Sequence, residues 1–318
     1  MDPVRFVIPK GSLEQATFKL LGQAWARVTR KERSYHVYLD DPGIRVKMMR
    51  PQEIPTLVAD GLYDIGITGL DWVRETSARV TEMADLEYGR IKLVTAFPDS
   101  LPHRSLDQML SQYISQKRIF RVSSEYLTTA SAFIKKCPSY MDAYGDADPL
   151  IVTPWLRRGD NEMVQILLSF GATEAKPPDD VDAIIDVTET GTTLVQNKLQ
   201  IADTVTTSSA RLIANPESLA DGTKSQKMGD IASLLAGAVQ ARKHLHIYFN
   251  VRKENLGAVL EQLSSLKRPT VSPLSDPNWY AINTIIRKEE YHSLVPRLSR
   301  MGQGLVVHEP RQILDMGQ

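Results

Sequence analysis

The chain has 318 residues, of which 42% are hydrophobic and 24% charged; these proportions are ordinary for a globular enzyme and exclude wholesale disorder. Its length corresponds to two or three domains. The 38 Lys and Arg residues balance the 38 Asp and Glu residues, whereas a protein that binds nucleic acid by neutralising phosphates usually carries a basic excess.

The cysteine content and the apolar segments bear on where the protein works. The sequence has 1 cysteine, Cys137, which excludes an internal disulfide and a cysteine-based zinc site and favours a reducing compartment. The N-terminal residues lack the apolar core of a signal peptide. The most apolar long stretch, residues 231–239, is much shorter than the roughly 20 residues that span a bilayer. We therefore expect a cytoplasmic protein with neither nucleic-acid nor membrane partners.

The chain begins with a strand, a glycine-containing turn and a helix. Residues 5–8 form the strand, Pro-Lys-Gly at residues 9–11 forms the turn, and Ser12 with Gln15 fits a capping box at the start of the helix. This turn places Lys10 at a helix N-terminus, where anions bind well.

The next segments repeat that arrangement. Residues 45–49 alternate as in a strand, and the turn at residues 50–55 leads into a short helix. Residues 64–69 form another strand, whose glycines, Gly66 and Gly69, indicate close approach of a ligand or of another backbone. The alternative is that both glycines only permit tight packing.

The middle of the chain is less regular. Residues 99–118 are predicted to be helical, and residues 135–178 mix Pro, Gly and Asp around a helix expected at residues 161–170. Residues 183–187 form the most apolar of the late strands. Strand and helix alternate as far as about residue 220, which predicts an α/β fold with a largely parallel sheet.

The last part of the chain is predicted to be a separate domain. The composition turns polar at residues 221–229, where we place a domain boundary, and a helix at residues 230–242 follows. Beyond it, strands and helices are expected in the order βαββαβ, the ferredoxin-like arrangement. The strands are expected at residues 245–251, 270–274, 279–286 and 304–308, and the helices at residues 256–263 and 294–298.

Residues 182–194 carry the sharpest chemical signal. A buried strand delivers Asp186 at its carboxyl end, and a loop of Thr190, Gly191, Thr192 and Thr193 follows. A glycine lets the backbone turn tightly around an anion, and the backbone N–H groups and threonine hydroxyls supply donors for a phosphate monoester. Asp186, and possibly Asp182, would then accept hydrogen bonds from the hydroxyls of a sugar. The alternative is a polar strand-to-helix turn with capping threonines.

This segment, Asp-Val-Thr-Glu-Thr-Gly-Thr-Thr-Leu at residues 186–194, resembles the phosphoribosyl-diphosphate signature of the ATP phosphoribosyltransferases, the first enzymes of histidine biosynthesis. Four other segments resemble motifs of that family in the same order: residues 8–13, residues 50–55, residues 64–69, and residues 269–274 followed by Trp279.

The sequence also departs from the family pattern. Glu53 replaces the usual aspartate, and Asp-Asp-Val-Asp at residues 179–182 stands where the family has Gly-x-Ala-Asp. The segment from Glu125 to Asp182 is roughly 25 residues longer than the family pattern, which is long for a connection between elements. One wall of the binding cleft is therefore expected to differ from that of the family.

The resemblance implies an α/β fold with a two-lobed catalytic part, like a periplasmic binding protein, and a C-terminal ferredoxin-like βαββαβ domain. The catalytic part would span residues 1–225, with lobe I at about 1–90 plus 195–225 and lobe II at about 91–194. The regulatory domain would span residues 226–318. The reaction would transfer the 5-phosphoribosyl group from phosphoribosyl diphosphate to N1 of ATP, giving phosphoribosyl-ATP and pyrophosphate.

The resemblance also implies the site residues. Lys10 and Arg50 would be the catalytic cations that hold the diphosphate or the ATP phosphates, although both could be ordinary solvated charges. Asp186 and Asp182 would hold the ribose hydroxyls. The 5′-phosphate is assigned to Thr190, Gly191, Thr192 and Thr193, and the nucleotide to Gly11, Gly66, Thr68 and Gly69. Mg²⁺ would bind mainly substrate oxygens, so no protein metal ligands are assigned.

The C-terminal domain is expected to be allosteric. The resemblance implies that it binds histidine as an inhibitor and helps dimers assemble into a hexamer, with Thr270 and Ser272 as part of the effector site. The alternative is a domain used only for assembly. His244 and His246 lie on one strand face, but without a third ligand they indicate a surface pair rather than a metal site.

Two other functions remain open at this stage. The first is a non-catalytic two-lobed module that binds a ligand, because the same architecture serves pure binders. The second is a phosphoribosyltransferase with another acceptor, such as a free base. The combination of acidic residues and a threonine loop favours a phosphoribosyltransferase, since an amino-acid sensor does not need it.

Overall fold

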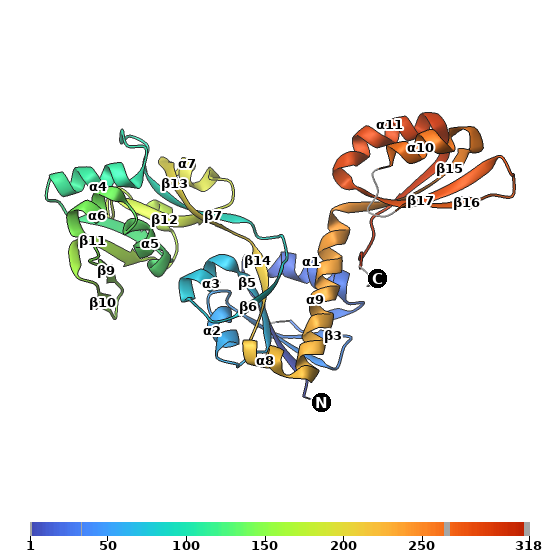
Figure 1. The fold of residues 1–318 in the computed structure, drawn as a ribbon. Coiled ribbons are helices and arrows are strands. Elements are labelled where there is room, and N and C mark those ends of the chain that lie inside the picture. Colours follow the sequence, from blue (N-terminus) through green and yellow to red (C-terminus); the bar gives the residue numbers. More distant parts are fainter. Residues whose placement is uncertain (1, 33, 264–267, 315–318) are drawn as a thin grey trace. The chain divides into compact units, whose positions relative to one another are not determined.

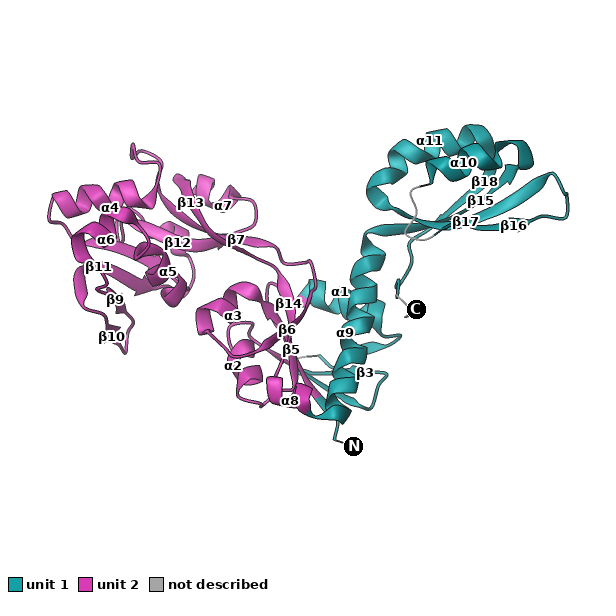
Figure 2. Ribbon diagram, in the orientation of Figure 1, with its two compact units in different colours: residues 1–4, 15–47, 221–318 teal, residues 5–14, 48–220 magenta. Residues whose placement is uncertain are grey.

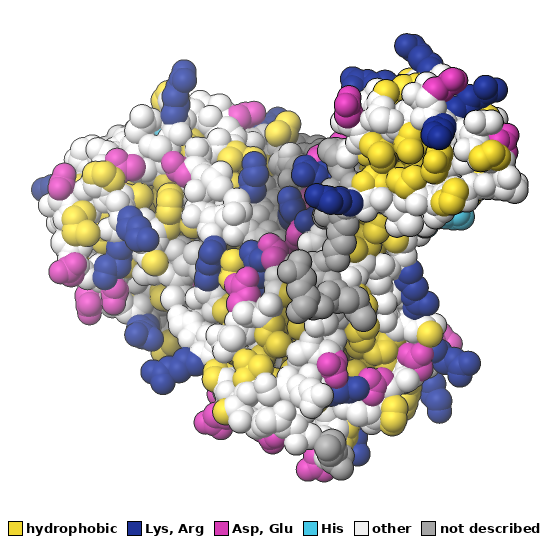
Figure 3. All heavy atoms as spheres, turned by 45° about the vertical axis from the view of Figure 1, so that its right-hand side comes forward, with side chains coloured by type: hydrophobic (Ala, Val, Ile, Leu, Met, Phe, Trp, Pro, Cys, Tyr) yellow, Lys and Arg dark blue, Asp and Glu magenta, His cyan; other side chains and the backbone are white. Residues whose placement is uncertain are grey.

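The computed structural model describes residues 2–32, 34–263 and 268–314 (Figure 1). The chain separates into two compact units (Figure 2). Unit 1 consists of Met1–Val4, Gln15–Lys47 and Asp221–Gln318, and unit 2 of Arg5–Glu14 and Met48–Ala220. Within the described ranges, every helix is too short or too polar to cross a lipid bilayer. Basic and acidic side chains are both spread over the face drawn in Figure 3, in keeping with the balanced charge of the sequence.

Unit 2 contains two sheets, and the first is built from the early strands of the chain. The strands of this sheet that belong mainly to unit 2 are β1 (Val4–Pro9), β5 (Ile65–Gly69), β14 (Ala210–Ala214) and β6 (Thr81–Asp85), adjacent in that order. β1 and β5 are parallel, and β14 is antiparallel to both of its neighbours. The helix α2 (Ile54–Ala59) begins in the predicted turn, and α3 (Leu70–Thr76) directly follows β5. Ile54 and Val58 pack on Val7 in a small core.

The second sheet of unit 2 has seven strands in the order β10-β9-β11-β8-β12-β7-β13. These strands are β7 (Ile91–Pro98), β8 (Phe120–Ser124), β9 (Pro149–Val152), β10 (Arg157–Arg158), β11 (Asn161–Leu168), β12 (Ala183–Thr188) and β13 (Leu199–Ser208). The inner strands β9, β11, β8 and β12 are parallel, so their carboxyl ends meet at one edge. The strands β7 and β13 are antiparallel to their neighbours.

Helices cover the second sheet. They are α4 (Leu106–Ser115), α5 (Leu127–Ile134) and α6 (Pro138–Tyr144), whose buried side chains join one core cluster, and α7 (Thr192–Gln196), whose Leu194 belongs to another. Successive residues of β12 point to opposite faces, so Ile185 packs in the first cluster and Ile184 in the second.

Three expectations for the catalytic part are corrected by the structure. The helix expected at residues 161–170 is the strand β11, because Val164 and Ile166 alternate with more exposed residues and the strand lies between β8 and β9. Within residues 99–118 only α4 is helical, and Ser105 caps it by accepting a hydrogen bond from the Gln108 N–H. β13 pairs with β7, so the chain returns to the first sheet after Ser208 rather than near residue 195.

Unit 1 contains the remaining elements. They are the helix α1 (Glu14–Ala24), the antiparallel strands β2 (Val28–Arg30), β3 (His36–Leu39) and β4 (Ile44–Met49), the helix α9 (Gly222–Arg242) and the C-terminal sheet. The short helix α8 (Pro216–Ala220) precedes α9 and is the last element of unit 2. β1, α1 and β4 each have residues in both units. α1 begins at Glu14, whose carboxylate accepts a hydrogen bond from the Gly11 N–H at 3.4 Å, in place of the expected capping box. α9 is capped by Asp221 and begins at Gly222, eight residues before the predicted start, so the expected boundary between residues 225 and 226 lies inside this helix.

The C-terminal part confirms the predicted βαββαβ order. Its elements are β15 (His244–Arg252), α10 (Leu256–Gln262), β16 (Thr270–Pro273), β17 (Trp279–Arg287), α11 (Tyr291–Met301) and β18 (Gly302–His308). The antiparallel sheet has the order β16-β17-β15-β18. Leu245, Ile247, Phe249 and Val251 alternate along β15 and pack under both helices in one hydrophobic cluster.

Candidate active site

The candidate site lies at the carboxyl edge of the parallel strands in the second sheet. Leu168 at the end of β11 pairs with Ser124 at the end of β8, and Ile184 of β12 pairs with Ser123. The residues that leave these strands therefore meet at this edge. They are Glu125, the segment at residues 169–176, and the threonine loop at residues 190–193.

Asp186 lies on β12 near that edge. Its side chain is half-buried, and one carboxylate oxygen accepts a hydrogen bond from the Val187 N–H at 2.7 Å. Burial raises the pKa of Asp186, and the charge of Glu174 raises it further, while Thr173 and the Lys176 ammonium oppose the rise. The predicted ribose-binding carboxylate thus sits among other charged groups at the strand end, as a binding residue would.

Glu125 is a site residue that the sequence analysis did not single out. It follows β8, and burial together with the neighbouring Asp186 charge raises the pKa of its carboxyl, which Lys176 counteracts. The next residue, Tyr126, donates a hydrogen bond to the Asp71 carboxylate at 2.7 Å. The available signal was an acidic residue directly after the strand β8, which is parallel to β12.

Lys176 is the second missed residue. Its ammonium group donates hydrogen bonds to the Ser123 hydroxyl at 2.9 Å and to the Ser169 hydroxyl at 2.7 Å. The Ser169 hydroxyl also lies 2.8 Å from that of Thr173. A cation is therefore fixed beside Asp186 and Glu125, where it partly offsets the rise in the pKa of both carboxyls.

The threonine loop has the conformation that its glycine predicts. Gly191 has a φ of 82°, in the left-handed region, and its N–H donates to the Thr188 hydroxyl at 2.8 Å. The hydroxyls of Thr190 and Thr192 lie 2.9 Å apart, and both of these threonines and Thr193 are exposed. The loop thus presents three accessible hydroxyls directly after β12.

Asp182 does not lie with this group. Four residues along a strand separate it from Asp186, a distance of about 13 Å. Its carboxylate accepts hydrogen bonds from the Tyr113 hydroxyl at 2.8 Å and from the Arg121 N–H at 2.7 Å. Burial and the Asp182 contact raise the pKa of Tyr113 to about 12, so the phenol stays a donor. The geometry supports a structural role for Asp182.

Two predicted residues of the first turns lie together. Gly11 has a φ of 95°, and a Cβ at this position would lie 3.3 Å from an Arg50 guanidinium nitrogen. The Lys10 N–H donates to the Met49 carbonyl at 2.8 Å, which ties the turn after β1 to the end of β4. Lys10, Gly11 and Arg50 thus come from one pair of adjacent turns.

The other predicted nucleotide-binding residues have packing explanations. A Cβ at Gly66 would come within 2.9 Å of Ile54 and Val58, so this glycine lets α2 approach β5. The buried Thr68 hydroxyl donates to the Pro51 carbonyl at 2.8 Å. A Cβ at Gly69 would overlap the Asp71 carboxylate. Close approach of the chain itself accounts for all three residues.

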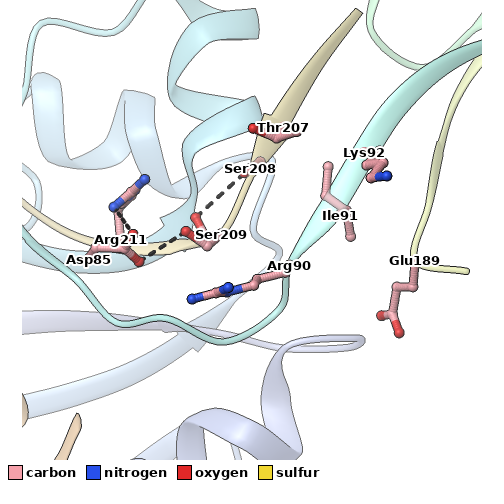
Figure 4. Close-up of a pocket in the computed structure, with 9 residues that line it drawn as sticks. All are labelled: Asp85, Arg90, Ile91, Lys92, Glu189, Thr207, Ser208, Ser209 and Arg211. Carbon is pink, nitrogen blue, oxygen red and sulfur yellow. Dashed lines mark hydrogen bonds and ion pairs between the residues drawn. The ribbon is translucent and has the colours of Figure 1, made fainter. Parts of the chain in front are cut away.

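Unit 2 also contains a pocket of about 400 Å³ beside the threonine loop (Figure 4). Glu189 lines one side of it, and Asp85, Ser209 and Arg211 line another. Burial favours a raised pKa at Asp85, but hydrogen bonds from the Glu87 N–H and the Ser209 hydroxyl and the Arg211 charge outweigh it and hold that pKa below its usual value. Arg90 and Lys92 line the same pocket, and sequence analysis did not single them out.

The predicted effector residues lie on the sheet edge of the C-terminal domain. Thr270 and Ser272 belong to β16, which pairs only with β17 among the described strands, and both side chains are exposed. His244 is buried and contacts the Gln240 carbonyl through Nδ1 at 2.8 Å, whereas His246 stacks on His308.

Comparisons with known proteins identify the family. The family model described as ATP phosphoribosyltransferase matches residues 50–237, and the model of the C-terminal domain of the same family matches residues 241–309. An ATP phosphoribosyltransferase of Solibacter usitatus is 38% identical over 308 residues, which cover 95% of this chain and 96% of that protein. The chain belongs to the ATP phosphoribosyltransferase family. It is therefore a glycosyltransferase of histidine biosynthesis.

A second relative and a solved structure of the family also match most of the chain. The ATP phosphoribosyltransferase of Pelotomaculum thermopropionicum is 34% identical over 312 residues, which cover 96% of this chain and 97% of that protein. The solved ATP phosphoribosyltransferase complex from Thermotoga maritima superposes with a TM-score of 0.57 at 21% identity, covering 75% of this chain and 98% of that chain. This similarity supports the predicted α/β fold of an ATP phosphoribosyltransferase.

Proposed function

We propose that this protein transfers the 5-phosphoribosyl group from phosphoribosyl diphosphate to N1 of ATP, which yields phosphoribosyl-ATP and pyrophosphate in the first step of histidine biosynthesis in the cytoplasm. The main support is the arrangement at the carboxyl edge of the second sheet: the three exposed hydroxyls of the threonine loop follow the strand that carries Asp186, and the half-buried carboxyls of Asp186 and Glu125 lie close together. Family membership supports the same reaction.

The proposed roles follow from the chemistry of the substrate. Thr190, Gly191, Thr192 and Thr193 bind the 5′-phosphate through hydroxyl and backbone donors. Asp186 and Glu125 accept hydrogen bonds from the ribose hydroxyls. Lys10 and Arg50 hold the diphosphate or the ATP phosphates, and Arg90 and Lys92 of the neighbouring pocket add positive charge for the same anions.

The reaction makes few demands on acid–base chemistry. The bond between ribose C1 and the diphosphate oxygen breaks, and adenine N1 forms the new bond to C1 with its lone pair. Because this nitrogen already carries a free lone pair, the enzyme needs no strong general base. Positive charge develops at the ribose ring, where the anionic Asp186 and Glu125 stabilise it, and catalysis consists of positioning and charge stabilisation.

Mg²⁺ would serve this reaction by neutralising the departing pyrophosphate. Among the described residues, no group of three His, Cys, Asp or Glu side chains has the spacing of a metal site. We propose that this ion is held mainly by the oxygens of the diphosphate, which is usual for Mg²⁺ bound to phosphate substrates.

We also propose that the C-terminal domain binds histidine as an inhibitor and joins copies of the chain into an oligomer, from dimer to hexamer. Thr270 and Ser272 offer exposed hydroxyls on the edge strand β16. Tyr248 of β15 and Val306 of β18 are 37% and 44% exposed on the sheet, so apolar surface is available for contact with a second copy.

The assay for the reaction uses the purified full-length protein with ATP, phosphoribosyl diphosphate and Mg²⁺, and pyrophosphatase removes the second product. We expect a product with the mass of phosphoribosyl-ATP that depends on all three components. If folded protein makes no such product, the proposed reaction is wrong. If a free base but not ATP is converted, the acceptor is wrong and the phosphoribosyl site stands.

A further inference from the structure

We propose that Lys176 is a positioning residue of the phosphoribosyl site: its ammonium group, held by Ser123 and Ser169, keeps the Asp186 and Glu125 carboxylates charged so that they accept hydrogen bonds from the ribose hydroxyls. This inference rests on the proposed function and deepens it. It assigns a cation to the ribose subsite, apart from Lys10 and Arg50.

The contacts of Lys176 fix where its charge lies. Ser123 is fully buried and Ser169 is 2% exposed, and both accept hydrogen bonds from the ammonium group, at 2.9 and 2.7 Å. The Ser169 N–H in turn donates to the Ser124 carbonyl at 2.9 Å, so the segment that carries Ser169 is tied to the end of β8. The cation is held by two neighbouring strand ends rather than left in solvent.

Two serine hydroxyls alone do not stabilise a partly desolvated cation. They are neutral, and a charge withdrawn from water requires a partner of opposite sign. The structure supplies such partners, because Lys176 interacts electrostatically with both Asp186 and Glu125. The lysine and the carboxylates therefore stabilise one another.

Lys176 lies in a region with several carboxyl groups, whose negative charges oppose one another's ionisation. Three carboxyl groups, those of Glu125, Glu174 and Asp186, lie in this region: the Glu174 charge raises the pKa of Asp186, and the Asp186 charge raises the pKa of Glu125. Such groups do not all ionise easily without a cation. Tyr126 and its partner Asp71 also titrate near this place, and burial raises the pKa of Tyr126, followed by Asp71 and then by Glu125 and Asp186. Lys176 is thus the charged group that opposes protonation of Asp186 and Glu125.

The direction of the pH effect follows. Lys176 lowers the pKa of Asp186 and Glu125, so its neutralisation raises both values. A carboxyl with a raised pKa takes up a proton at a higher pH and then no longer accepts two hydrogen bonds from a diol. Ribose binding in a variant without this charge should therefore fail at low pH and recover as pH rises.

The test measures binding of ribose 5-phosphate to the full-length protein by calorimetry between pH 5.5 and 8.5, without ATP or turnover. The variants are Lys176→Met, Lys176→Arg and, as a matched control, Lys136→Met, which removes an exposed lysine of the same lobe. We expect K176M to move the pH midpoint of binding upward by about 1 unit or more, with affinity close to wild type at the highest pH. K176R and K136M should keep the wild-type midpoint. The titration of the sugar phosphate itself is common to all variants.

Two results for K176M would overturn the inference. An equal loss of affinity at every pH would make Lys176 a direct ligand of the phosphate, and an unchanged midpoint with unchanged affinity would remove it from the site. If K176M does not fold, K176Q provides the same test, because its amide can donate to one or both serines without a charge. If the wild-type protein binds no ribose 5-phosphate at any pH, the proposed phosphoribosyl site is wrong. Binding by the wild-type protein thus tests the site itself, and the pH midpoint of K176M tests the role of Lys176.

Discussion

At the scale of single residues, the account depends on polar groups at the end of β12. Asp186 and Thr192 are assigned to the ribose and to its phosphate, so each proposed hydrogen bond to the substrate has one ionised partner. We predict that Asp186→Asn and Thr192→Val each weaken phosphoribosyl diphosphate binding by about 1.5–3 kcal/mol, roughly ten- to a hundredfold in KM.

The same strand offers a matched control for that prediction. Asp182→Asn alters the identical functional group at the opposite end, where it contacts Tyr113 and Arg121. We expect this variant to lower the free energy of unfolding while leaving KM unchanged. Steady-state kinetics and urea unfolding of the three variants give the comparison. An unchanged KM in both D186N and T192V would contradict the residue assignments.

At the scale of elements, the sequence predicted some strands correctly and one strand wrongly as a helix. β12 was predicted from its apolar run at residues 183–185, and β15 was predicted because burial on alternating residues leaves a period of two in the sequence. β11 was misassigned as a helix, since a short apolar run is compatible with either structure until its neighbours are known. Its place between two parallel strands depends on tertiary contacts that the local sequence does not carry.

The sequence likewise predicted only part of the candidate site. The threonine loop was found because its residues are adjacent in the chain and glycine marks the turn. Glu125 and Lys176 were missed because they lie 61 and 10 residues before Asp186 and reach it only through the sheet. Gly66 was assigned to the nucleotide, although its lack of a side chain serves the packing of α2 on β5.

At the scale of the whole molecule, we predict that histidine lowers the rate of the wild-type enzyme and that Thr270→Val with Ser272→Ala relieves this inhibition without changing the uninhibited rate. The substitutions lie on β16 in unit 1, whereas the proposed catalytic residues lie in unit 2, so a selective effect would indicate coupling between separate sites. The measurement is initial rate against histidine concentration. Equal inhibition of the variant would move the effector site elsewhere.

The most direct measurement for the central claim is a crystal structure of the full-length protein with phosphoribosyl diphosphate. We predict that the 5′-phosphate lies against the hydroxyls and amides of residues 190–193, with the ribose hydroxyls on Asp186 and Glu125. A bound sugar phosphate elsewhere, with the threonine loop empty, would contradict the account.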